Sequence, residues 1–138
     1  MLIEDDQVVL IRRERRGVAP YYLFPGGGIE AGETAEEAAV REAFEELGIE
    51  VRLEGLLAVV EFSGNSQQYF RASRVAGTFG TGSGNELTAA ATSDTGSYTP
   101  VWMPIDALHR LDVRPRDLAM LVATRDLPAD PVTIIDTN

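Results

Sequence analysis

Three glutamates, Glu42, Glu45 and Glu46, stand close together in the first half of the 138-residue chain. If this segment is helical, their i, i+3 and i+4 spacing places three carboxylates on one face within a single turn. Like charges at this spacing repel, so one interpretation is a solvated acidic face that Arg41 partly neutralises. The other interpretation is a site for hard divalent cations, which prefer oxygen ligands and offset the repulsion.

The residues that precede the glutamates decide between these interpretations. Five residues separate Gly27 from Glu33, and seven more separate Glu33 from Arg41, which opens the run Arg-Glu-Ala-Phe-Glu-Glu-Leu-Gly-Ile ending at Ile49. This pattern resembles the Nudix box, Gly-x5-Glu-x7-Arg-Glu-U-x-Glu-Glu-x-Gly-U with U apolar, and Ala43 is the small residue at the first U. Seven fixed residues would match by chance in such a chain with a probability on the order of 10⁻⁵. The sequence is therefore identified as a member of the Nudix hydrolase family.

The resemblance implies a role for each acid of the box. Glu45 and Glu46 would be the main ligands of one to three magnesium or manganese ions, and Glu42 would be a further ligand or the base that activates water. The carbonyl group of Gly26 or Gly27 would complete the coordination. Glycine suits those positions because a backbone without Cβ can approach an ion closely.

Glu33 and Arg41 would orient this cluster, since Arg41 stands one turn before Glu45 and can hold its carboxylate. Outside the box, family members often draw a further base or metal ligand from a loop. Glu86, in a loop rich in glycine and serine, is the candidate here. The alternative for Glu86 is an ordinary solvated carboxylate.

Substrate-binding candidates lie on the strands before the box. Arg12 and Arg13 could contact phosphate, and one of them should point to solvent because neighbours on a strand face opposite ways. Tyr22, Phe24 and Tyr69 could stack on a base. Aromatic residues in strands are more often part of the core, which is the competing interpretation.

Residue types that are rare or missing exclude several kinds of chemistry. The chain has no cysteine, so disulfides, thiol nucleophiles and cysteine-ligated zinc are excluded. Its one histidine, His109, lies in a short polar helical turn and is expected at the surface. The net charge of −10 argues against a long nucleic acid as partner, whereas a small nucleotide bridged to the protein by metal ions remains compatible.

The length and the 44% hydrophobic content fit one domain over residues 1–138. The longest uncharged stretch is interrupted by proline and glycine, so we expect no membrane span. An acidic start without a basic and apolar leader predicts a cytoplasmic protein. Family members usually have a longer first strand, so the sheet edge should be short or contributed by another subunit, as in a homodimer.

The glutamates need a helix to position them, and the sequence predicts one over Thr34 to Leu47. Thr34 and Glu37 form a capping box at its start, and Gly48 suits a left-handed cap at its end. The predicted core-facing stripe repeats at i, i+4 and i+7 and consists of Val40, Phe44 and Leu47.

The remaining segments supply strands, a second helix and a loop. β-forming residues predict strands at Val8 to Ile11, Tyr21 to Phe24, Leu56 to Phe62, Tyr69 to Val75 and Tyr98 to Met103. Pro115 to Arg125 reads as an amphipathic helix with Leu118, Leu121 and Val122 on one face, and Gly77 to Gly96 as a long loop. This order favours an α/β layered domain. The resemblance implies a Nudix-type α/β/α sandwich with a mixed β-sheet between helices.

The function implied by the resemblance is magnesium-dependent hydrolysis of a diphosphate bond in a nucleoside diphosphate linked to another moiety, by metal-activated water. The chain lacks the proline associated with ADP-ribose pyrophosphatases, having Asn65 and Ser66 there, and lacks the motif of the NADH-directed enzymes. Nucleoside and deoxynucleoside triphosphates, dinucleoside polyphosphates and nucleotide sugars stay open. The alternative is a Nudix-fold nucleotide sensor that does not cleave its ligand. An isoprenyl diphosphate isomerase of the same fold would need a cysteine, which this chain lacks.

Overall fold

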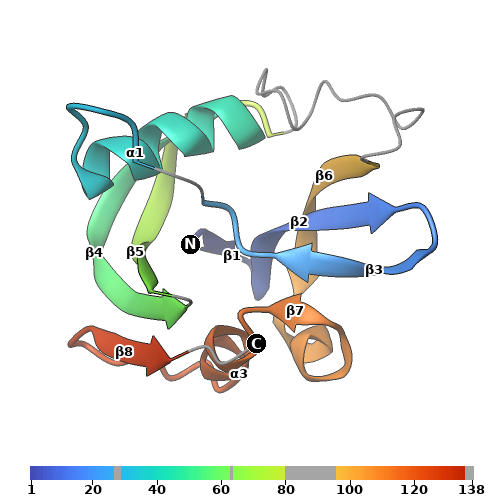
Figure 1. Cartoon of the computed structure of the whole chain (residues 1–138). Coiled ribbons are helices and arrows are strands. Elements are labelled where there is room, and N and C mark those ends of the chain that lie inside the picture. Colours follow the sequence, from blue (N-terminus) through green and yellow to red (C-terminus); the bar gives the residue numbers. More distant parts are fainter. Residues whose placement is uncertain (27–28, 63, 80–95, 136–138) are drawn as a thin grey trace.

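The computed structural model describes residues 1–26, 29–62, 64–79 and 96–135. In this part of the chain the strands form two sheets (Figure 1). The five-stranded sheet comprises β1 (Ile3–Glu4), β2 (Gln7–Arg15), β3 (Val18–Leu23), β6 (Ser97–Pro104) and β7 (Val113–Arg114). The three-stranded sheet comprises β4 (Ile49–Phe62), β5 (Asn65–Gly77) and β8 (Val132–Ile135).

Both sheets mix parallel and antiparallel pairs. Strand β2 is antiparallel to β1, β3 and β6, while β7 runs parallel to β3. In the other sheet β4 and β5 form a long antiparallel hairpin, and β8 runs parallel to β4. A parallel bridge between Leu2 and Ala72 joins the two sheets. The expected mixed strand pairing is confirmed, although it is divided over two sheets.

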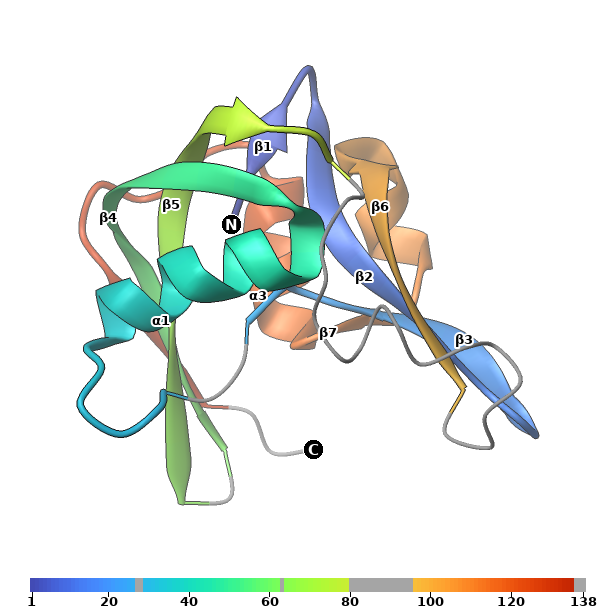
Figure 2. The same cartoon turned by 90° about the horizontal axis from the view of Figure 1, so that it is seen from above.

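The helices α1 (Ala35–Glu42) and α3 (Arg116–Ala123) lie on opposite sides of the strands (Figures 1 and 2). Residues Leu118 and Val122 of α3 belong to the larger core cluster, together with Leu10 and Leu57 from the two sheets. A second cluster packs against the end of the first helix and contains Leu2, Val9, Ile11, Leu47 and Ile49. The α/β layering expected from the sequence is therefore confirmed.

Each of the five expected strands lies within or overlaps an observed one, with shifts at the ends. The largest difference is β4, which begins at Ile49 rather than Leu56. Charged residues at Glu50, Arg52 and Glu54 alternate with apolar ones there, a period of two that is typical of a strand and that the prediction from Leu56 onward left out. Strands β1, β7 and β8 have only two to four residues, too few to give a pattern.

The start and the end of the first helix agree with the prediction. Thr34 Oγ1 accepts from the Glu37 N–H at 3.1 Å, and the Glu37 carboxylate accepts from the Thr34 N–H at 2.9 Å. Gly48 ends the helix in the left-handed region, with φ 78°. The final turn, Ala43–Leu47, is a π-helix rather than a continuation of α1.

The predicted apolar stripe of this helix is wrong in two of its three positions. Val40 and Phe44 are 39% and 54% exposed, and only Leu47 is buried. Val40 is two residues from both Ala38 and Glu42, the buried residues of α1, and therefore lies on the opposite face of the helix. The buried residues of the α-helix and the π-turn are Ala38, Glu42, Glu46 and Leu47.

Two further expectations concern the exposure of His109 and the length of the helices. His109 lies in the 3-10 helix Ile105–Arg110 and is exposed, as expected. Over the described ranges, none of the helices is both long and apolar enough to cross a bilayer.

Candidate active site

The glutamates of the helix have unequal surroundings. Glu42 and Glu46 are only 7% and 8% exposed, whereas the Glu45 side chain is 44% exposed. A fully solvated acidic face is therefore the wrong interpretation for two of the three. Glu42 and Glu46 are four residues apart, a spacing that places both side chains on the same, buried face of the helix.

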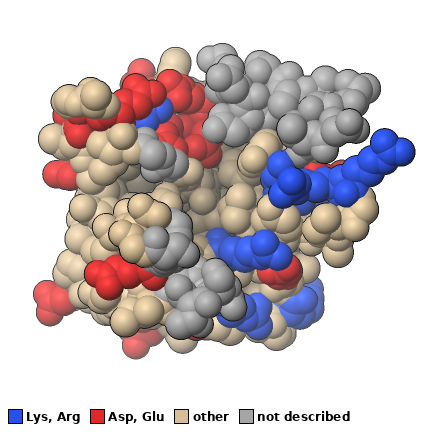
Figure 3. Space-filling view, viewed as in Figure 1, with Lys and Arg blue, Asp and Glu red and all other residues tan. Residues whose placement is uncertain are grey.

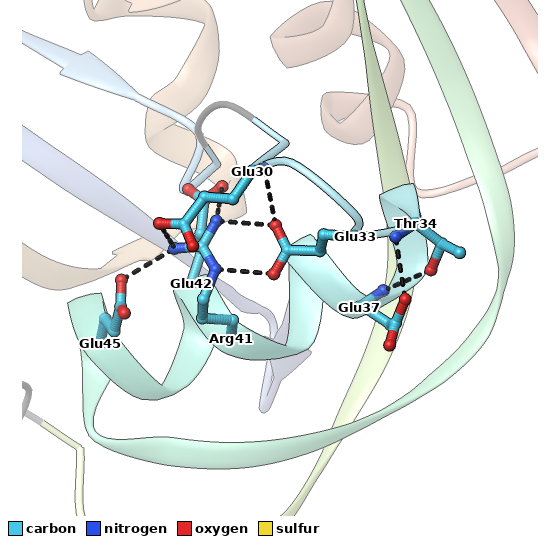
Figure 4. Close-up of polar contacts among 7 residues, drawn as sticks. All are labelled: Glu30, Glu33, Thr34, Glu37, Arg41, Glu42 and Glu45. Atoms are coloured by element: carbon cyan, nitrogen blue, oxygen red, sulfur yellow. Dashed lines mark hydrogen bonds and ion pairs between the residues drawn. The ribbon is translucent and has the colours of Figure 1, made fainter.

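Arg41 stands at the centre of the acidic residues (Figure 4). Its Nε and Nη2 donate to the two carboxylate oxygens of Glu33 at 2.8 and 3.1 Å, and its Nη1 donates to Glu45 at 2.9 Å. Carboxylate oxygens of Glu30 and Glu42 each lie 3.7 Å from the same guanidinium. One cation thus contacts four carboxylates, and it holds Glu45 as the sequence predicted.

The Arg41–Glu33 pair stays ionised over a wide pH range. The hydrogen bond from Arg41 lowers the pKa of Glu33 below its ordinary value, and the Glu30 N–H, which donates to Glu33 at 2.9 Å, acts in the same direction. The same hydrogen bond raises the pKa of Arg41. Glu33 therefore provides a fixed negative charge that orients Arg41.

Gly26 and the helix line a common cavity of about 610 Å³, to which the helix contributes Glu42 and β5 contributes Tyr69. A Cβ atom on Gly26 would clash with Nε2 of Gln67, so a larger residue here would require the flexible Gln67 side chain to move. Gly27, the other predicted carbonyl ligand, lies outside the described residues.

The chemistry of these donors fits a hard divalent ion, although the geometry shows no assembled cluster. Among the described residues, no three His, Asp or Glu side chains converge closely enough to hold a metal. The carboxylates of buried Glu42 and Glu46, that of Glu45, which Arg41 holds, and the backbone of Gly26, which lines the same cavity as Glu42, are nonetheless oxygen donors of the kind that Mg²⁺ and Mn²⁺ prefer.

Arg12 and Arg13 face opposite ways, as predicted. Arg13 is 6% exposed, and its guanidinium carbon lies 4.0 Å from the ring centroid of Tyr98. Its Nη1 also donates to the carbonyl oxygen of Ser97 at 3.5 Å. Arg12 is partly exposed, with Nε 2.9 Å from the Glu14 carboxylate.

The aromatic candidates serve mainly the core. Phe24 is 4% exposed and packs edge-on against Tyr69, with ring centroids 6.2 Å apart. Tyr22 packs against the same cluster. Their core interpretation therefore holds, and stacking of a ligand on Phe24 is not favoured. Glu86, the loop candidate, lies outside the described residues.

Sequence reasoning missed a pair formed by Tyr21 and Arg114. The Arg114 guanidinium carbon lies 3.9 Å from the centroid of the Tyr21 ring, and Nη2 donates to Asp112 at 3.0 Å. Because β3 and β7 are far apart in the sequence, no local pattern connects these residues. The alternation of β3 could have shown only that Tyr21 and Tyr22 face opposite ways.

Comparisons with known proteins agree with the family that the Nudix box indicates. Residues 1–123 match the model of the NUDIX domain. An ADP-ribose pyrophosphatase of Methanocaldococcus jannaschii is 41% identical over 56 residues, which are 41% of this chain and 33% of that protein. The human 8-oxo-dGDP phosphatase NUDT18 is 31% identical over 121 residues, covering 88% of this chain and 35% of that protein. The chain thus spans about a third of the length of these relatives.

The fold comparison is independent of sequence similarity. The crystal structure of an ADP-ribose pyrophosphatase from Streptococcus suis matches with a TM-score of 0.65, covering 96% of this chain and 92% of that one. At 15% identity this likeness concerns the fold alone. The match over residues 1–123 shows that the chain belongs to the NUDIX domain family.

Proposed function

We propose that the chain hydrolyses a diphosphate bond in a nucleoside diphosphate linked to another moiety, with Mg²⁺ or Mn²⁺ as cofactor. One observation carries this proposal: the helix buries Glu42 and Glu46 while it exposes Val40 and Phe44. Burying a carboxylate is costly unless cations lie near it, and one cation, Arg41, already lies 3.7 Å from Glu42. A binding site for cations accounts for this reversal of the usual amphipathic pattern, and membership of a hydrolase family supports it.

The proposed metal ligands are Glu42, Glu45, Glu46 and the carbonyl groups of Gly26 and Gly27. When bound, the ion would polarise the attacked phosphorus and lower the pKa of a water molecule. The protein supplies orientation and proton transfer.

Each of these tasks falls to a residue of the site. Arg41 holds Glu45, and Glu33 holds Arg41. Glu42, which lines the cavity, would accept the proton of the attacking water at a carboxylate oxygen.

The relatives narrow the set of substrates to be tested. One is named an ADP-ribose pyrophosphatase and another an 8-oxo-dGDP phosphatase. We therefore propose a small nucleotide as substrate. The panel should combine ADP-ribose and oxidised guanine nucleotides with ordinary nucleoside triphosphates, dinucleoside polyphosphates and nucleotide sugars.

The test is hydrolysis of this panel with Mg²⁺, with products separated by chromatography and ¹⁸O-labelled water identifying the attacked phosphorus. We expect the wild type to release a nucleoside monophosphate from at least one substrate, and Glu46→Gln to lose this activity. Glu54→Gln is the matched control, because Glu54 is an exposed acid on β4. Hydrolysis that persists in Glu46→Gln would contradict the assignment of the site.

The alternative of a nucleotide sensor makes a different prediction for the same panel. A sensor would bind a nucleotide without releasing any product, with or without the ion. Location in the cytoplasm and assembly as a homodimer are further proposals, which cell fractionation and light scattering after size-exclusion chromatography would test.

A further inference from the structure

The pair of Tyr21 and Arg114 lies close in the fold to the end of β3, from which the chain continues to Gly26. Leu23 and Arg114 are partners in the parallel pairing of β3 and β7, and the Phe24 N–H donates to the carbonyl oxygen of Arg114 at 3.4 Å. Gly26 is two positions after Phe24, which corresponds to at most about 7 Å of extended chain. The backbone of Arg114 is thus held next to the segment that leads into the proposed metal site.

The pair also lies on the face of the five-stranded sheet that is turned toward the acidic helix. Tyr21 and Leu23 are two residues apart on β3, so their side chains point to the same face. Leu23 packs against the core cluster that contains Leu47, at the end of the acidic helix. Tyr21 therefore extends outward from the contact between sheet and helix, on the side where the glutamates lie.

The charge distribution agrees with this placement. In the space-filling view, acidic side chains gather around α1 and basic ones gather across the β2–β3 side of the same face (Figure 3). A substrate held at its diphosphate near α1 could therefore extend toward β3 and β7 without leaving this face.

The contacts of Arg114 determine which ligand it can take. One flat side of its guanidinium covers Tyr21, and its Nε and Nη2 donate to the two carboxylate oxygens of Asp112 at 3.2 and 3.0 Å. The Arg114 side chain is still 52% exposed. Asp112 therefore neutralises the charge and occupies one donor edge, which disfavours a phosphate. The outward flat side of the guanidinium stays available, and such a surface suits a planar aromatic ring.

We propose that Arg114, backed by Tyr21, is the platform on which the nucleobase of the substrate stacks. This inference rests on the proposed function, because it assigns the base to one end of the site and the diphosphate to the other. Stacking on a guanidinium uses the π-face that every base has, so the platform favours a base without selecting strongly among bases.

The test compares Arg114→Ala and Arg114→Lys with the wild type on a nucleotide substrate found in the panel. Both variants should raise KM about tenfold with little change in kcat, since lysine keeps the charge but has no planar group. Tyr21→Leu should raise KM in the same direction. The matched control is Arg125→Ala, because Arg125 is also an exposed arginine that pairs with an aspartate, Asp106, at 2.9 Å.

Three outcomes would overturn the proposal. Retention of the wild-type KM by Arg114→Lys would show that charge matters rather than stacking, so that the group bound is an anion. An unchanged KM in Arg114→Ala would remove Arg114 from the site. An equal loss in Arg125→Ala would show a general electrostatic effect. Circular dichroism melting curves of all variants would identify any change caused by unfolding.

A second measurement separates this proposal from the proposed function. In isothermal titration calorimetry without metal, Arg114→Ala and Arg114→Lys should bind a nucleoside monophosphate about tenfold more weakly than the wild type. If the wild type hydrolyses nothing but shows this difference, the proposed hydrolysis fails and the platform stands. If the wild type hydrolyses nucleotides while all three variants bind and react normally, only the platform fails.

Discussion

At the scale of single residues, Arg41 determines how the acidic cluster is arranged. Its planar guanidinium makes two parallel hydrogen bonds to Glu33 and a third to Glu45. Lysine carries the same charge but has no fork that can bind one carboxylate with two donors while reaching another. The geometry of the donors, as well as the charge, therefore matters at this position.

We predict that Arg41→Lys lowers the affinity for Mn²⁺ or the rate of hydrolysis by about 10- to 100-fold, the usual effect of losing a group that orients metal ligands. Electron paramagnetic resonance titration with Mn²⁺ and steady-state kinetics would measure both quantities. Arg52→Lys is the control, since Arg52 is 72% exposed and its nearest carboxylate is 3.6 Å away. Wild-type affinity and rate in Arg41→Lys would refute the role of the fork.

The lowered pKa of Glu33 predicts a dependence of stability on pH. A carboxyl group whose pKa is lower in the folded state stabilises the fold above its unfolded value, about 4.3, and this contribution disappears as pH falls through the folded value. Glu33→Gln should therefore be less stable than the wild type at pH 7, and the difference should shrink at pH 3. Urea unfolding at both pH values would measure it, and a difference that grows toward acid would contradict the pairing.

At the scale of elements, the helix that carries the box shows where sequence patterns succeed and fail. The capping box at Thr34 and the left-handed Gly48 depend on local hydrogen bonds and backbone angles, so both were predictable from the sequence. The π-turn over Ala43–Leu47 has no such local signature. Val40 lies in the regular α-helix before that turn, where the buried face carries Ala38 and Glu42, so the apolar spacing indicated a helix but not which of its faces is buried.

The observed burial predicts effects of very different size for two substitutions in the π-turn. Phe44→Gln should change the free energy of unfolding by no more than about 0.5 kcal/mol, because the ring is largely exposed. Leu47→Ala should cost about 2–5 kcal/mol, because Leu47 is 3% exposed within a core cluster. Chemical denaturation would measure the free energy of unfolding of both variants. A large loss of stability in Phe44→Gln would show that the Phe44 ring belongs to the core, as the predicted apolar stripe requires.

The strands likewise show which features can be predicted from the local sequence and which depend on contacts between distant residues. Segments with four or more apolar or β-forming residues, such as those in β2 and β6, were predictable because alternation and composition are local properties. The pairing of β3 with β7 was not, since it joins residues about ninety positions apart. For that reason the box glutamates could be found from the sequence, while the position of Arg114 beside Tyr21 could not.

At the scale of the whole molecule, net charge and fold have to be considered together. The chain carries a formal charge of −10, and several of its acids crowd around one end of α1. Cations that bind the folded chain should reduce this repulsion and therefore stabilise the fold.

We predict that Mg²⁺ at about one hundred times its dissociation constant raises the free energy of unfolding by about 2.7 kcal/mol, provided that the unfolded chain does not bind it. Urea unfolding with Mg²⁺ and with a chelator would measure the difference. The double variant Glu42→Gln with Glu46→Gln should lose the increase. An equal increase in that variant would indicate nonspecific screening of charge.

The π-turn makes the site depend on the number of residues as well as on their identity. Removing a single residue such as Ala43 would return the segment toward regular α-helical geometry and would leave Glu45 two residues after Glu42 instead of three. Residues two apart on a helix do not face each other, so the cluster would be broken even though every acid of the motif was still present. A related sequence with one residue fewer in this turn can therefore keep the composition of the motif and lose its geometry.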